Sequence, residues 1–123
     1  MYDDDTITDE TKVKKVIMCS GKIYFDLTDK RENREDVAII RLEQLYPLPQ
    51  NQLDSLYKKY SKAIWYWVQE EPQNMGAASY LKMNLENINF HIISRKASAS
   101  TASGYSKVHA KEQADIINAA FSI

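Results

Sequence analysis

Four short apolar runs are the feature that most constrains the fold of this chain. They cover residues 16–19, 37–40, 63–68 and 90–93, and polar residues follow each of them directly. Runs this short, rich in β-branched and aromatic residues, are typical of strands that are buried on both faces. The chain between consecutive runs is long enough for a helix, as a crossover between parallel strands requires. We therefore predict a mainly parallel sheet of four or five strands.

The segments between and after the runs contain apolar residues at helical spacing. The clearest amphipathic helix follows the spacing i, i+3, i+4 and i+7 at Leu53, Leu56, Tyr57 and Tyr60. Pro49 is expected in the first turn of this helix, where its missing N–H is tolerated. Similar spacing predicts three more helices, near residues 23–27, 77–85 and 110–121. Strands that alternate with helices predict an α/β fold, a three-layer α/β/α sandwich.

Composition and charge restrict the class of protein. A chain of 123 residues suits one domain, which we place at residues 13–123, after an acidic stretch at 1–12 that we expect to be a linker. The net charge of −1 argues against nucleic acid or an anionic membrane as partner, because both need a concentrated basic face. The longest purely apolar stretch, residues 63–68, is too short to span a bilayer. The single cysteine, Cys19, excludes an intramolecular disulfide and is expected to be a buried hydrophobe.

The polar residues after each run are expected to meet at one edge of the sheet. They are Ser20-Gly21-Lys22, Glu43-Gln44, and the stretches 69–72 and 94–96. Because the carboxyl ends of parallel strands lie together, these segments would line the edge where open α/β sheets bind their ligands. The pattern therefore indicates a surface for contact with a partner or ligand.

Two of these segments are candidate anion contacts. Ser20 and Lys22 come between a strand and a helix start, where free backbone N–H groups attract anions. No phosphate-loop or G-x-G-x-x-G pattern accompanies them, so a tight turn with a solvated lysine is the alternative. Arg95 precedes a hydroxyl-rich stretch, residues 97–101, and could hold a phosphate or a carboxylate. A solvated strand end is the alternative there.

Residue types that often carry catalysis lack a catalytic arrangement here. Glu70 and Glu71 are adjacent in a strand and point to opposite faces, so they cannot flank one substrate bond. We expect a structural role, with one of them pairing with a basic residue or capping a helix. His91 and His109 belong to no cluster with metal-ligand spacing. A hydrolase built on Cys19 and a histidine would need a third member to orient the pair. We predict no catalytic, cofactor-binding or metal-binding residue.

Five segments, in this order and spacing, resemble one known family. They are VIMCSGKIY (residues 16–24), REDVAIIRLEQLYPLP (34–49), VQEEPQNMGA (68–77), SRKASAS (94–100) and GYSKVH (104–109). Together they are similar to the C-terminal domain of the E1 component of 2-oxoglutarate dehydrogenase, a thiamine-diphosphate-dependent enzyme of the transketolase superfamily. The likeness runs from about residue 12 to residue 121. No single segment is specific, but the ordered set is.

The resemblance implies a fold and a role. It implies the transketolase C-terminal fold and a non-catalytic interface domain, inactive when isolated. The parent enzyme would decarboxylate 2-oxoglutarate oxidatively in the citric acid cycle and pass a succinyl group to lipoyl-E2. Thiamine diphosphate, magnesium and the catalytic histidines would belong to the preceding domains of a homodimer. The implied location is the cytoplasm of a bacterium, or the mitochondrial matrix of a eukaryote.

Some relatives suggest an alternative, a regulatory module that binds acetyl-CoA or AMP at the border with the catalytic domain. Ser20, Lys22, Gln44 and Arg95 would be its nucleotide contacts. Gln44 matches a glutamine of those relatives, but Asn51 and Gln52 stand where the relatives carry basic residues. This departure argues against a nucleotide, because each lost charge-assisted contact is worth about 1.5–3 kcal/mol.

Overall fold

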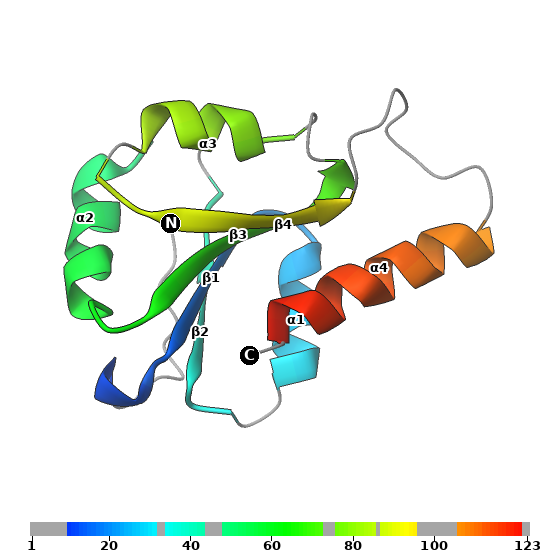
Figure 1. The fold of residues 1–123 in the computed structure, drawn as a ribbon, viewed down its shortest axis with the longest axis horizontal. Helices are drawn as coiled ribbons and strands as arrows, with labels where there is room; N and C mark the ends of the chain where they lie inside the picture. The colour runs from blue at the N-terminus through cyan, green and yellow to red at the C-terminus, as the bar shows by residue number, and fades with distance from the viewer. Residues whose placement is uncertain are drawn as a thin grey trace.

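A computed structural model describes residues 10–31, 34–43, 48–72, 76–85, 87–95 and 106–121 of the chain. Its four strands form one parallel sheet in the order β2-β1-β3-β4 (Figure 1), with bounds β1 (Lys15–Cys19), β2 (Val37–Arg41), β3 (Ile64–Pro72) and β4 (Phe90–Arg95). The predicted α/β sandwich with a mainly parallel sheet is confirmed. Residues 96–105, which include the hydroxyl-rich stretch and any fifth strand after β4, lie outside the described residues, as do residues 1–9 of the expected linker.

Helices cover both faces of the sheet (Figure 1). One layer holds α1 (Ile23–Arg31) and α4 (Ser106–Phe121), and the other holds α2 (Gln50–Lys59) and α3 (Ala78–Asn84). The sheet thus separates two apolar cores, one under each helix layer. None of the described helices combines the length and the apolar character needed to cross a membrane.

Side-chain alternation along the strands supplies both cores. In β1, Val16 and Met18 pack with α2 and α3, whereas Ile17 and Cys19 pack with α1 and α4. All five residues of β1 are buried, as expected for a central strand between two helix layers. Burial of this kind is worth about 1.5–3 kcal/mol for each large apolar side chain.

Three boundaries differ by a few residues from the predicted ones. Pro49 is the N-cap of α2 and not part of its first turn. The first helix continues past residue 27 through the charged Asp29 and Lys30 and ends at Arg31. Strand β3 extends to Pro72, because edge strand β4 stays beside it and pairs Arg95 with Pro72 after a register shift. Proline is tolerated at such an end because no further ladder bond is required of its nitrogen.

The strand order creates a switch point between β1 and β3. The chain leaves β1 through α1 on one face to reach β2, and leaves β2 through α2 on the other face to reach β3. Connections that diverge in this way open a crevice at the carboxyl ends of the two central strands. The fold therefore places residues after Cys19 and residues near the end of β3 beside one crevice.

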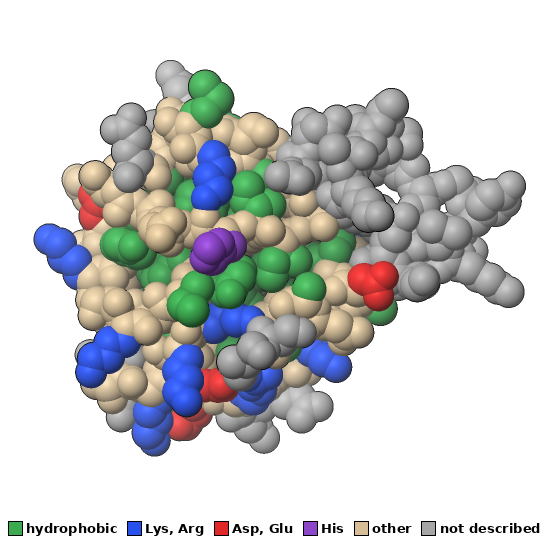
Figure 2. Space-filling model, viewed as in Figure 1, with side chains coloured by type: hydrophobic (Ala, Val, Ile, Leu, Met, Phe, Trp, Pro, Cys, Tyr) green, Lys and Arg blue, Asp and Glu red, His purple; other side chains and the backbone are tan. Residues whose placement is uncertain are grey.

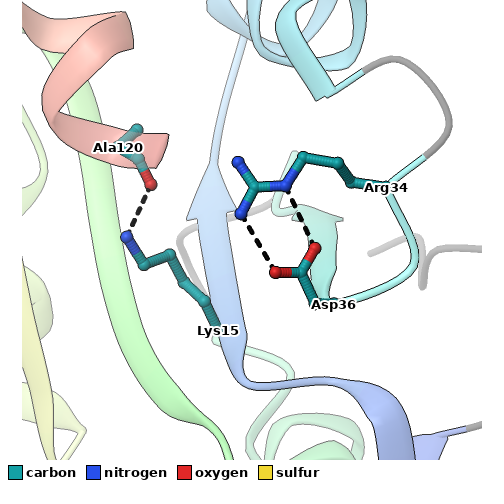
Figure 3. A network of polar contacts seen from close by, with 4 residues as sticks. All are labelled: Lys15, Arg34, Asp36 and Ala120. Carbon is teal, nitrogen blue, oxygen red and sulfur yellow. Dashed lines mark hydrogen bonds and ion pairs between the residues drawn. The ribbon is translucent and has the colours of Figure 1, made fainter. Parts of the chain in front are cut away.

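A buried lysine ties the C-terminal helix to the sheet. Lys15 Nζ donates a hydrogen bond of 2.9 Å to the carbonyl oxygen of Ala120 near the end of α4 (Figure 3). A cation is favourable there because the last carbonyls of a helix carry partial negative charge. Burial, followed by the nearby Arg34, lowers the pKa of Lys15, while Asp36 opposes the shift. Arg34 and Asp36 form their own bidentate pair, at 3.0 and 3.1 Å.

Candidate functional site

A pocket of about 530 Å³ lies at the carboxyl ends of β1 and β3. Ser20 and Gly21, directly after β1, line the pocket, and so does Tyr80 of α3. Trp67 and Glu71 of β3 also line it. The volume is in the range of small-molecule sites and of pockets that receive an anchoring side chain. The crevice predicted from the sheet topology is thus lined by residues of two family segments.

Gln69 is a buried hub of hydrogen bonds beside this pocket. Its side chain is 2% exposed. Its Oε1 accepts from Trp67 Nε1 at 2.8 Å and from the backbone N–H of Ala78 at 3.1 Å, while its Nε2 donates to the carbonyl oxygen of Glu71 at 3.1 Å. A buried amide needs such partners, because an unmade hydrogen bond in an apolar setting is costly. Gln69 therefore fixes the indole, the start of α3 and the end of β3 relative to one another.

Gly76 makes room for this arrangement. Its φ is +68°, a backbone conformation that favours glycine. A Cβ at this position would lie 2.8 Å from Glu71 Oε2 and 3.1 Å from Gln69 Oε1. The carboxylate of Glu71 therefore lies close across Gly76, on the pocket side of β3.

The two adjacent glutamates point to opposite faces of the sheet, as predicted. Glu70 Oε1 accepts a hydrogen bond of 2.9 Å from Gln113 Nε2 of α4, and the same amide donates to Asp26 of α1 at 3.1 Å. The partner of Glu70 is thus an amide, where the sequence analysis expected a basic residue or a helix start. Glu71 lines the pocket on the α3 side. Glu70 thus helps to hold α4 on the sheet, whereas Glu71 lines the pocket.

The predicted anion contacts are not all brought together. Ser20 lines the pocket, whereas Lys22 is exposed and does not line it. Gln44 lies outside the described residues. Arg95 ends β4, the strand next to β3, and only its backbone is described.

The sequence analysis placed Gln69 at this edge without giving it a role, and it missed Gly76 and Tyr80 as pocket residues. A signal for Gln69 was present, because residues 65, 67 and 69 share one face of a strand. On that face, the polar Gln69 follows two buried tryptophans, Trp65 and Trp67. No pattern indicated that residues 76 and 80, beyond the end of the strand, would fold back over this edge.

Cys19 has the properties of a core residue. It is fully buried, and its pKa is raised to about 12, by burial first and by the nearby Glu43 second. A thiol with that pKa stays protonated near neutral pH and is a poor nucleophile. Within the described ranges, no three His, Cys, Asp or Glu side chains gather closely enough to hold a metal ion.

A second surface lies over edge strand β4. Figure 2 shows a histidine there among hydrophobic side chains, and His91 of β4 is exposed, with its ring centroid 5.4 Å from that of Tyr66. Ile64, at the start of β3, is 54% exposed.

Comparison with known proteins gives one consistent result. The chain matches the family model described as 2-oxoglutarate dehydrogenase C-terminal over residues 1–121. The 2-oxoglutarate dehydrogenase E1 component of Rickettsia typhi is 43% identical over 126 residues, which cover 95% of this chain and 14% of that protein. The proteins of the same name from Haemophilus influenzae and Cupriavidus necator are 43% and 45% identical, over 93% and 91% of this chain and 13% of each relative. The chain thus spans about one seventh of the length of these curated relatives.

Proposed function

Because this chain belongs to the family of 2-oxoglutarate dehydrogenase C-terminal domains, we propose that it is a non-catalytic interface domain of an E1 component. The parent enzyme would decarboxylate 2-oxoglutarate oxidatively, pass succinyl to lipoyl-E2 and reside in the bacterial cytoplasm or a mitochondrial matrix. The domain would dock its carboxyl edge on the remaining domains of the chain and on the second subunit of a homodimer. The observation that carries this proposal is the pocket at that edge, which is lined from the family segments that follow β1 and end β3.

The described residues do not fit thiamine diphosphate. Among the described residues that line the pocket, Glu71 is the charged one, and its carboxylate would repel a diphosphate. Magnesium bound with the cofactor needs oxygen ligands, and the described ranges hold no acidic cluster for it. We therefore assign the cofactor and the chemistry to the rest of the E1 chain.

A test of the interface role uses an E1 component that lacks its own C-terminal domain. The Haemophilus influenzae protein, ended before the segment that matches this chain, is mixed with the 123-residue chain. We expect association in size-exclusion chromatography and a gain in decarboxylation of 2-oxoglutarate with thiamine diphosphate and Mg²⁺. Turnover by the 123-residue chain alone would contradict the proposal, and so would full activity of the shortened E1 without it.

A regulatory nucleotide site is the second candidate function. Ser20, Lys22, Gln44 and Arg95 would contact acetyl-CoA or AMP. The exposed Lys22 at the start of α1, next to the pocket wall, favours this reading, because an ammonium there could hold a phosphate. The carboxylate of Glu71 and the neutral, exposed Asn51 and Gln52 weigh against it.

Calorimetry separates the two candidate functions. A nucleotide module should release heat with acetyl-CoA or AMP, and Lys22→Ala should weaken that binding. Binding that is unchanged in Lys22→Ala removes the assigned contact. Absence of heat at millimolar nucleotide, with the shortened E1 present to complete any shared site, leaves the interface role alone.

A further inference from the structure

The pocket at the carboxyl edge carries an acidic group, Glu71, for which the described residues supply no hydrogen-bond or ion-pair partner. Within the described part of the chain, the carboxylate of Glu71 accepts no hydrogen bond and forms no ion pair. Gln69, its neighbour in the pocket, already uses its Oε1 for two donors. Among the described lining residues, the charged acceptor left for a bound group is therefore the Glu71 carboxylate, and Ser20 lines the same pocket.

The rest of the pocket is aromatic and apolar. The nearly buried Trp67, 2% exposed, and the half-buried Tyr80 both line it. Gly76 adds no side chain beside the Glu71 carboxylate, where a Cβ would lie 2.8 Å from Oε2. A guanidinium group matches this combination, because it stacks on aromatic rings and forms paired hydrogen bonds with a carboxylate. An anion is disfavoured by the charge of Glu71.

The geometry points to an arginine side chain, presented by the part of the E1 chain outside this domain, as the occupant of the pocket, with its guanidinium paired to Glu71. The inference rests on the proposed interface function, since it takes the partner from the six sevenths of the relatives' length that this chain does not match. The pocket, at about 530 Å³, is larger than one side chain and leaves room for adjoining backbone. Arginine held in a central pocket is a common anchor of protein interfaces.

The first test asks whether the pocket recognises a guanidinium. The ¹⁵N-labelled chain is titrated with N-acetyl-arginine methylamide and, as a neutral match of the same shape, with N-acetyl-citrulline methylamide. We expect saturable shifts of the Gly21, Gly76 and Ala77 amides and of the Trp67 indole N–H with the arginine compound only. Equal shifts with citrulline, or none with arginine, would overturn the inference.

Two variants test whether the charge of Glu71 is responsible for binding the guanidinium. Glu71→Gln keeps the shape of an exposed side chain, so the fold should persist, as circular dichroism can verify. The variant should bind the arginine compound at least about tenfold more weakly, the equivalent of losing one charge-assisted hydrogen bond. Glu35→Gln makes the same charge change at an exposed site that pairs with Lys12, and it should leave binding unchanged. Equal affinity in wild type and Glu71→Gln would overturn the inference.

The second test identifies the source of the arginine. Association of the chain with the shortened Haemophilus influenzae E1 should weaken at least about tenfold in Glu71→Gln. It should stay unchanged in Glu35→Gln. Association that persists in Glu71→Gln would reject this pocket as the anchor while the interface role survives. If the wild-type chain does not associate with the shortened E1, that result would count against the interface role and also against the rest of the E1 chain as the source of the arginine. The titration would still report on the pocket.

Discussion

Two buried polar side chains on opposite faces of the sheet, Gln69 and Lys15, are satisfied in different ways. Gln69 lies at the carboxyl end of β3 and joins three elements through neutral hydrogen bonds. Lys15 lies at the amino end of β1 and holds one carbonyl of α4 with an ammonium. The neutral hub should be insensitive to pH, whereas the lysine contact should titrate. The comparison teaches that, among the described lining residues, uncharged groups shape the candidate site and Glu71 supplies its charge.

Removing the neutral hub should have the largest effect. Gln69→Leu leaves the Trp67 indole N–H and the Ala78 N–H without acceptors in a buried setting, which should cost about 3 kcal/mol of unfolding free energy. Urea denaturation followed by circular dichroism measures it. The same change in a Trp67→Phe background should cost about 1 kcal/mol less, because one unpaired donor is gone. Equal losses of unfolding free energy in both backgrounds would contradict the role of Gln69 as the acceptor for the Trp67 indole.

Adding a methyl group beside the hub should have the next largest effect. Gly76→Ala introduces a Cβ 3.1 Å from Gln69 Oε1 at a φ of +68°, and the backbone strain alone is worth about 1–2 kcal/mol. Gly21→Ala is the matched control, because Gly21 has a φ of +79° with nothing within 4 Å of the added Cβ. Thermal unfolding should show a larger loss for Gly76→Ala. Equal losses would mean that the contacts around Gly76 add nothing.

The charged contact on the other face should be weaker and dependent on pH. Lys15→Met removes the bond to Ala120 and should cost about 1 kcal/mol at pH 7. The pKa of Lys15 is lowered from 10.5 in the folded state, so the unfolded state binds more protons between the folded and unfolded pKa values. The contribution of Lys15 should therefore grow as pH rises toward 10.5. Denaturation from pH 7 to 10.5 should show a widening difference in unfolding free energy between wild type and Lys15→Met. A difference that shrinks over this range would contradict the lowered pKa of Lys15.

The surface pair near Lys15 should contribute least. Arg34 holds the pKa of Asp36 below its ordinary value of 3.8, through their hydrogen bonds first. Asp36→Asn should cost under about 1 kcal/mol at pH 7, because the pair is partly solvated. A lowered carboxyl pKa stabilises the fold above the unfolded value, and that gain is lost as pH falls through the folded value. Wild type and variant should therefore converge in acid, and a difference that persists at pH 2 would argue against the pair.

The sequence predicted the scaffold because burial periodicity is local information. The apolar run at residues 37–40 forms β2, as predicted, and Trp65 and Trp67 share one face of β3, as side-chain alternation requires. The opposite directions of Glu70 and Glu71 follow from the same rule. The partner of Glu70 did not follow, because Gln113 lies 43 residues away and meets it through packing of α4 on the sheet.

By itself, the sequence determined the parallel α/β sandwich, the edge at which polar residues gather and, through its ordered segments, the family. Tertiary structure alone decided which of those residues share a pocket. Gly76 and Tyr80 reach it because α3 folds back over the carboxyl end of β3, a contact that Gln69 fixes. The physical reason is that secondary structure depends on neighbours along the chain, whereas a pocket depends on contacts between elements that the sequence does not encode by spacing.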